Sequence, residues 1–301
     1  MTTTMEAPVA AQSAQPRPGL TRRRRRGITG VVVGVIVLVA LLWSLAPIYW
    51  MLTTSFKGGL EATQLNPTYW PKHWTTGNYG ELTGGSVPFV SFFVNSVVTS
   101  LVAAVICVIV GALGGYSLSR ASYRLSGFCG QLILAARILP LVVLVAPLYL
   151  VLLKVHLLNS YLGLIIGFTS FGLPFAVWMM KGFIDAVPRE IEEAARVDGY
   201  GRVGILVRIV LPMSVPGLLT TATFVFMDSW NNLLYPSILM NSQNSKTLTP
   251  GLLDSFTGQF KTDWGGMMAA ACITSVPLVV VFFAVQRYMV RGLTAGALAG
   301  E

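Results

Sequence analysis

The chain has 301 residues, of which 54% are hydrophobic and 11% charged, and its formal net charge is +9. Soluble domains carry about 25% charged residues, so a deficit along the whole chain excludes an ordinary soluble protein and indicates a polytopic, all-α membrane protein. The three cysteines, Cys107, Cys129 and Cys272, lie in or beside apolar runs at no metal-ligand spacing. Neither a disulfide framework nor a metal site is therefore expected.

Residues 1–27 are predicted to be a disordered, basic tail. They are rich in Thr, Ala, Gln and Pro and contain five consecutive arginines. The uncharged run that follows, residues 28–55, is longer than the roughly 20 residues that cross a bilayer. It shows no small-residue cleavage site, so we interpret it as a retained transmembrane helix rather than a secretory signal.

Five further apolar runs follow in chain order. They cover residues 87–118, 128–153, 157–180, 213–240 and 264–285, and polar segments separate them. We therefore expect a six-helix transmembrane domain over residues 28–290. A polar loop is predicted for residues 241–263 and a short tail for residues 291–301.

The basic residues favour one orientation of these six spans. If the amino terminus is cytoplasmic, the cytoplasmic segments hold 15 Lys or Arg residues and the external segments hold 5. Because positive charge accumulates on the cytoplasmic side, both termini of this multi-pass protein are predicted to be cytoplasmic. The net charge of +9 thus reflects topology, and binding of nucleic acid is not expected.

The segment 185–212 is the most charged part of the chain. Five of the twelve acidic residues lie in its first fourteen positions. Pro188 is predicted to occupy the first position of a helix that ends near Gly199, with Ala194 and Ala195 on a contact face and Glu192 and Glu193 on the opposite face. A second short helix is expected from about residue 202 to Pro212, which would open the fifth span.

The charged segment also contains a spaced motif, EAA-x3-G-x9-I-x-LP. Its positions are Glu193, Ala194, Ala195, Gly199, Ile209, Leu211 and Pro212. This spacing resembles the signature loop of the permease subunits of ABC importers. The segments around Trp230 and residues 292–300 are similar to the six-span subunit of maltose-type sugar permeases, although the lysine usual near Ala299 in that subfamily is absent.

The resemblance implies a type I importer permease fold in which this loop is a cytoplasmic coupling helix. It implies a second permease, two copies of a cytoplasmic ATPase and an extracytoplasmic binding protein as partners. The sequence has no G-x-x-x-x-G-K-[ST] phosphate loop, so ATP and Mg²⁺ would bind the partner ATPase, and this chain would need no cofactor and be no enzyme. The residues implied in ATPase coupling are Glu193, Ala194, Ala195, Asp198, Gly199, Ile209, Leu211 and Pro212.

A weaker set of candidates concerns the path of the substrate, for which the resemblance implies a di- or oligosaccharide, a polyol or a glycerol phosphodiester. Polar groups inside a span are costly and therefore suggest function. Trp230 could stack on a sugar ring beside the amides of Asn231 and Asn232. Tyr149 is a further aromatic candidate for the substrate path. The alternative is that these polar groups form hydrogen bonds between helices.

Two other classes of function fit the sequence less well. A polytopic membrane enzyme would need acids close to His or Cys near one membrane face, whereas the acids here cluster on a short helix without either. An ion-coupled secondary transporter would need buried acids, and Asp228 is the only acid within an expected span. Dependence on ATP and sensitivity to vanadate would separate the importer from both alternatives.

Overall fold

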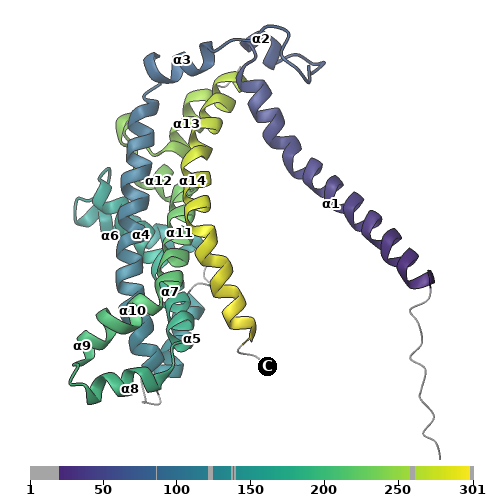
Figure 1. Ribbon diagram of the computed structural model, residues 1–301. Helices are drawn as coiled ribbons and strands as arrows, with labels where there is room; N and C mark the ends of the chain where they lie inside the picture. Colours follow the sequence, from purple (N-terminus) through teal and green to yellow (C-terminus); the bar gives the residue numbers. More distant parts are fainter. Residues whose placement is uncertain are drawn as a thin grey trace, which may run out of the picture. The chain divides into compact units, whose positions relative to one another are not determined.

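The computed structural model describes residues 20–85, 87–120, 125–136, 138, 140–257 and 262–298, without the side chains of residues 20–28, 125, 126, 134 and 289–298. The chain falls into two compact units, Met1–Trp50 and Met51–Glu301. Residues 20–50 of helix α1 (Leu20–Ser55) form the described part of the first unit (Figure 1). Its apolar segment, Thr29–Ser55, is long enough to span a bilayer.

The second unit is a bundle of helices. These are α2 (Gly59–Ala62), α3 (Gly77–Gly84), α4 (Phe89–Arg120), α5 (Leu125–Ala136), α6 (Leu141–Lys154), α7 (Tyr161–Asp185), α8 (Arg189–Val197), α9 (Arg202–Ile205), the π-helical turn η1 (Leu206–Val210), α10 (Leu211–Met213), α11 (Val215–Trp230), α12 (Leu234–Leu239), the 3-10 turn η2 (Gln243–Ser245), α13 (Leu248–Phe256) and α14 (Trp264–Leu298). Apart from them, an isolated antiparallel bridge joins Thr257 and Thr262. The predicted all-α class is confirmed.

Several helices are long and apolar enough to cross a membrane. Among the described residues there are four, in α1, α4, α7 and α14, and a fifth if Arg202–Met213 and Val215–Trp230 count as one bent span. The expected third span, 128–153, consists instead of α5 and α6, with Pro140 at the start of α6. A proline has no N–H to donate, so it favours a helix start over a helix interior. The polytopic membrane fold is therefore confirmed, with its third expected span divided.

The prediction of one continuous fifth span over residues 213–240 is wrong. The chain bends by 76° between Arg202–Met213 and α11, at Ser214. Pro216 lies in the first turn of α11, where its missing N–H costs nothing. Helix α11 ends at Trp230, and the side chain of Asn232 then accepts a hydrogen bond from the N–H of Tyr235, in the first turn of α12.

Helices α4 and α7 pack against each other along a seam of small residues. A Cβ added at Gly111 would lie 2.8 Å from the Cβ of Ala176, and one added at Gly115 would lie 2.7 Å from the backbone nitrogen of Lys181. These two glycines, four positions apart, therefore let the two backbones approach closely, as small residues do between membrane helices. The seam makes α4 and α7 the central pair of the bundle, and α11 packs against both.

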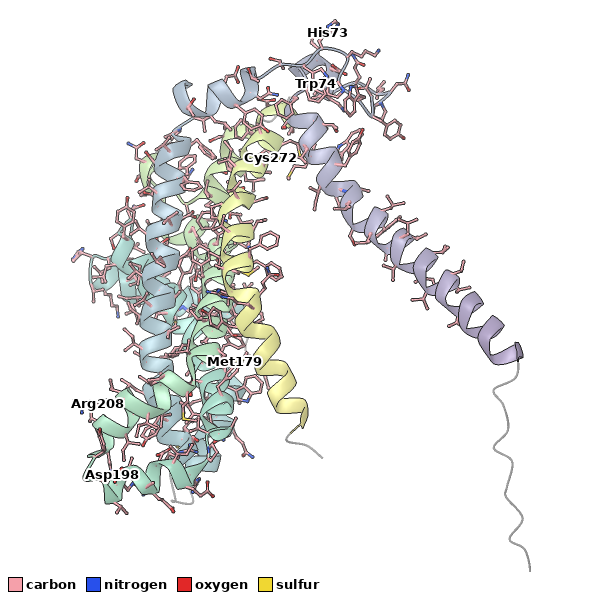
Figure 2. All side chains as sticks on the ribbon, viewed as in Figure 1. His73, Trp74, Met179, Asp198, Arg208 and Cys272 are labelled. Carbon is pink, nitrogen blue, oxygen red and sulfur yellow. The ribbon has the colours of Figure 1, made fainter. Side chains whose placement is uncertain are left out.

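The two ends of the bundle carry different structures. Helices α8 and α9, with Asp198 and Arg208, lie at one end, while α3 and α13 lie at the other (Figures 1 and 2). The segment 241–263, predicted to be a polar loop, contains η2 and α13. It is fastened to α4 because Asn95 donates hydrogen bonds to the carbonyls of Asn244 and Lys246, at 2.9 and 2.8 Å.

Candidate functional site

Helix α8 begins and ends where local sequence rules place it. Pro188 occupies the N-cap position, one residue before the position predicted for it, and Glu190 and Glu192 lie in the first turn, where the helix dipole favours negative charge. At the other end Gly199 has a φ of 87°, a left-handed conformation. Its N–H donates to the carbonyl of Arg196, and the N–H of Tyr200 donates to that of Ala195. This pair of bonds is a Schellman cap.

The conformation of Gly199 leads to a first prediction. Gly199→Ala should destabilise α8 by about 1 kcal/mol, because a Cβ disfavours the left-handed region, although open space surrounds this position. Hydrogen exchange of the amides of α8 would measure the change. The matched control is Gly201→Ala, whose φ of −74° suits alanine. Equal exchange in both variants would contradict the prediction.

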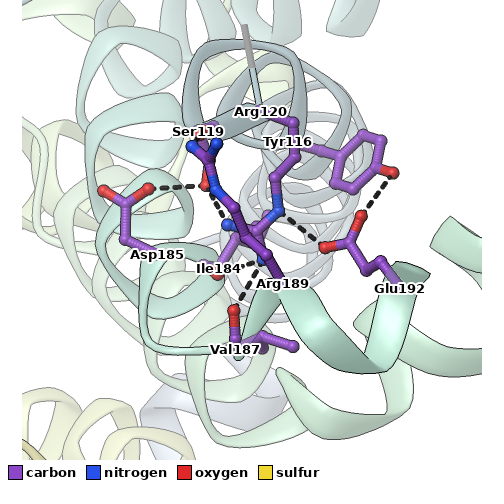
Figure 3. A network of polar contacts seen from close by, with 8 residues as sticks. All are labelled: Tyr116, Ser119, Arg120, Ile184, Asp185, Val187, Arg189 and Glu192. Carbon is purple, nitrogen blue, oxygen red and sulfur yellow. Dashed lines mark hydrogen bonds and ion pairs between the residues drawn. The ribbon is translucent and has the colours of Figure 1, made fainter. Parts of the chain in front are cut away.

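Glu192 is buried, contrary to the prediction that it faces away from the contact side. It is 1% exposed. Its Oε1 accepts a 2.6 Å bond from the Nε of Arg120, the last residue of α4, and its Oε2 accepts from the hydroxyl of Tyr116 at 3.1 Å (Figure 3). The carboxylate can be buried because the guanidinium of Arg120 neutralises its charge and the hydroxyl of Tyr116 donates to its second oxygen.

The two motif alanines do not share one contact face. Ala195 is buried in a small core with Met180, Ile184 and Ile205, whereas Ala194 is exposed. The reason is that Ala195 stands three positions after the buried Glu192, on the same side of α8. Ala195 therefore holds α8 against its own chain, and Ala194 remains available on the surface.

The second half of the loop returns to the bundle as one bent helical stretch, α9–η1–α10. Ile209 and Leu211 are partly buried against the small core around Ala195. Pro212 is exposed and lies inside this stretch, so the prediction that it opens the fifth span is wrong; the bend comes at Ser214. Arg208 lies over the ring of Tyr200 at 5.8 Å and joins the two halves of the loop.

The outer surface of this loop is hollowed and partly apolar. An open hollow of about 530 Å³ is lined by Glu190, Ile191, Ala194, Ala195, Asp198, Tyr200, Arg208 and Ile209. Val197 and Val203 of the same loop are 89% and 74% exposed. Glu193 is exposed on the same helix but does not line the hollow. The outer surface of this charged loop therefore exposes apolar side chains.

The candidates for a substrate path are not brought together. Trp230 is buried and packs against Phe93 and Phe226, with ring centroids 5.7 and 5.5 Å away. Tyr149 belongs to a different core cluster, around α6 and α7. Asn232 accepts a hydrogen bond from the N–H of Tyr235. Asn231, the C-cap of α11, is the one exposed side chain among these four.

Sequence reasoning missed two features. One is the contact between Arg120 and Glu192; the three-residue spacing of Glu192 and Ala195 could have indicated that both face inward. The other is a hollow of about 200 Å³ beside α11, lined by Phe171, Gly172, Phe175, Met179, Phe224, Val225 and Asp228. The charged Asp228 in an apolar run was a signal for it.

Known proteins that are similar in sequence identify the class of this protein. Residues 108–295 match the family "Binding-protein-dependent transport system inner membrane component". The inner membrane ABC transporter permease protein YcjP of Escherichia coli (strain K12) is 36% identical, over 93% of this chain and 99% of that protein. The diacetylchitobiose uptake system permease protein DasC of Streptomyces coelicolor is 33% identical, over 89% of this chain and 96% of that protein.

The fold has a solved counterpart as well. A chain of a bacterial ABC transporter involved in the import of the acidic polysaccharide alginate superposes with a TM-score of 0.76 at 21% identity, over 91% of this chain and 99% of that chain. The protein is thus a membrane-embedded permease, a transport component rather than an enzyme. It belongs to the family of binding-protein-dependent transport system inner membrane components.

Proposed function

We propose that this permease imports a sugar and that the loop 185–212 couples it to an ATPase. The name of DasC, a relative along most of the chain, specifies diacetylchitobiose, and the motif and carboxyl end resemble maltose-type permeases. The substrate class is accordingly a di- or oligosaccharide or a related polyol or glycerol phosphodiester. On the substrate path, the exposed amide of Asn231 is the best placed of the four candidates.

The coupling role is supported mainly by the surface that the loop exposes. It offers an open hollow and exposed valines at one end of the bundle, while its inner face is fixed by the buried Glu192. A rigid inner face with an apolar outer face suits a helix that docks into a cleft of another protein. Glu193, Ala194 and Asp198 contact the ATPase in this proposal.

The remaining motif residues give the loop its shape. Ala195, Ile209 and Leu211 pack it against its own chain, Gly199 closes α8, and Pro212 precedes the bend. A fixed shape lowers the entropic cost of docking, because the loop is already ordered before the ATPase arrives.

The proposed assembly has two permeases, this chain and a second one, with two copies of the ATPase and one binding protein. It lies in the bacterial inner membrane with both termini of this chain in the cytoplasm, as the distribution of Lys and Arg favours. ATP and Mg²⁺ bind the ATPase, and this chain holds no cofactor of its own.

Glu193→Lys tests the coupling role. Reversing an exposed charge at the docking surface should abolish sugar uptake and release the ATPase during purification, while the permease still reaches the membrane. Uptake of labelled di- and oligosaccharides and the amount of ATPase that co-purifies are the measurements. Glu81→Lys, an exposed acid on α3 at the other end of the bundle, is the matched control. Normal uptake by Glu193→Lys would refute the coupling role.

A further inference from the structure

The buried contact of Arg120 joins three helices at one point. Its Nε binds Glu192 of α8 at 2.6 Å. Its Nη2 donates to the carbonyls of Ile184, in the last turn of α7, and of Val187, between α7 and α8, at 3.0 and 2.8 Å. Since Arg120 is itself the last residue of α4, a single guanidinium holds the ends of α4 and α7 and the start of α8 together (Figure 3).

Neighbouring side chains reinforce this point. Ser119 donates to the carboxylate of Asp185 on α7 at 2.5 Å, and Arg189 of α8 donates to the backbone carbonyl of Ser119 at 3.1 Å. Tyr116 gives Glu192 a second donor. Both oxygens of the buried carboxylate are thereby satisfied by groups of α4.

The geometry makes this contact stiff. A guanidinium is planar and its donors point in fixed directions, so α8 cannot move away from Arg120 without breaking the ion pair. The side chains of Arg120 and Glu192 are only 12% and 2% exposed, and separating a buried pair leaves a charge without a partner. The seam at Gly111 and Gly115 continues the attachment by holding α4 directly on α7.

We propose that Arg120 and Glu192 are positioning residues that transmit the displacement of α8 to α4 and α7 as one body; we call this pair the coupling joint. The inference rests on the proposed function, in which α8 docks on the ATPase. The loop then has two roles, one on each side of α8. The exposed Glu193 side of α8 receives the ATPase, and the buried Glu192 side passes the motion into the membrane domain.

The test measures sugar transported per ATP hydrolysed, with the full transporter and its binding protein in proteoliposomes. Glu192→Ala should leave the ATPase bound and hydrolysing ATP, but should lower transport per ATP about tenfold, a factor typical of the coupling between two sites. Glu192→Gln, which still accepts a bond from Arg120, should recover part of this loss. A merely structural role would instead lower the amount of assembled transporter and leave the ratio unchanged.

Tyr116→Phe is a milder variant, which removes only one hydroxyl. It tests the same proposal if Glu192→Ala does not fold. It should lower transport per ATP about threefold, because a hydrogen bond to a charged acceptor is lost. Unchanged transport per ATP in the variants that assemble would overturn the coupling joint, and so would release of the ATPase by Glu192→Ala. Failure of Glu193→Lys to impair uptake would overturn the proposed function instead, so the two failures are distinguishable.

Discussion

Gly111→Val is expected to separate α4 from α7 and to destabilise the permease by about 3 kcal/mol, the upper part of the range for overpacked cores. The added Cβ would lie 2.8 Å from the Cβ of Ala176 and 2.9 Å from its backbone carbon. Because part of the obstacle is backbone, a change of rotamer cannot relieve it. Unfolding of the purified protein in mixed micelles, followed by tryptophan fluorescence, would measure the loss of stability.

A glycine on the same pair of helices provides the control. A Cβ added at Gly182 of α7 meets nothing within 4 Å, so Gly182→Val should change stability far less. Gly115→Val should act like Gly111→Val, since its Cβ would lie 2.7 Å from the backbone nitrogen of Lys181. If Gly111→Val unfolded at the same denaturant concentration as Gly182→Val, the close packing of α4 on α7 would be refuted.

Asn95→Leu is expected to free the segment 243–256 from α4. The Asn95 side chain is 2% exposed, donates to two carbonyls of that segment and accepts a 2.6 Å bond from the hydroxyl of Tyr161. Leucine has a similar size but leaves these three groups without their partner, at about 1–3 kcal/mol for each that stays buried. Hydrogen exchange over residues 243–256 should accelerate, which mass spectrometry would detect.

The control for this prediction uses the partner of Asn95. Asn244 offers its backbone carbonyl to Asn95, so Asn244→Ala keeps the bond and should leave exchange in the segment unchanged. Slow exchange in Asn95→Leu would mean that other contacts hold the segment. The packing of Gly251 of α13 against Phe92 is the contact to examine in that case.

Local features of the loop were predictable from the sequence. The end of α8 at Gly199 follows from a short-range rule, because glycine alone adopts a left-handed conformation without strain from a side chain. The motif spacing likewise indicated the family before any geometry was known. The error at Pro212 was also local: Pro216, four residues later, is the proline that starts α11, and the bend precedes it.

Long-range contacts were beyond such reasoning. The burial of Glu192 depends on Arg120, which lies 72 positions earlier and meets α8 only because α4 and α7 end side by side. Trp230 was a plausible sugar contact by residue type, but it is buried and its ring contacts those of Phe93 and Phe226. In both cases a contact that decides the surroundings of the side chain comes from a different helix: Arg120 of α4 for Glu192, and Phe93 of α4 for Trp230.

The two ends of the loop 185–212 are attached in different ways. At its start, Arg120 and Arg189 bind it to α4 through several bonds, whereas at its end it meets α11 at a 76° bend. Backbone bonds continue across this bend, since the N–H of Ser214 donates to the carbonyls of Val210 and Leu211, and the N–H of Leu218 donates to that of Ser214. In the proposed coupling role, a displacement of α8 is therefore expected to tilt α4 and α7 together and to reach α11 through the bend at Ser214.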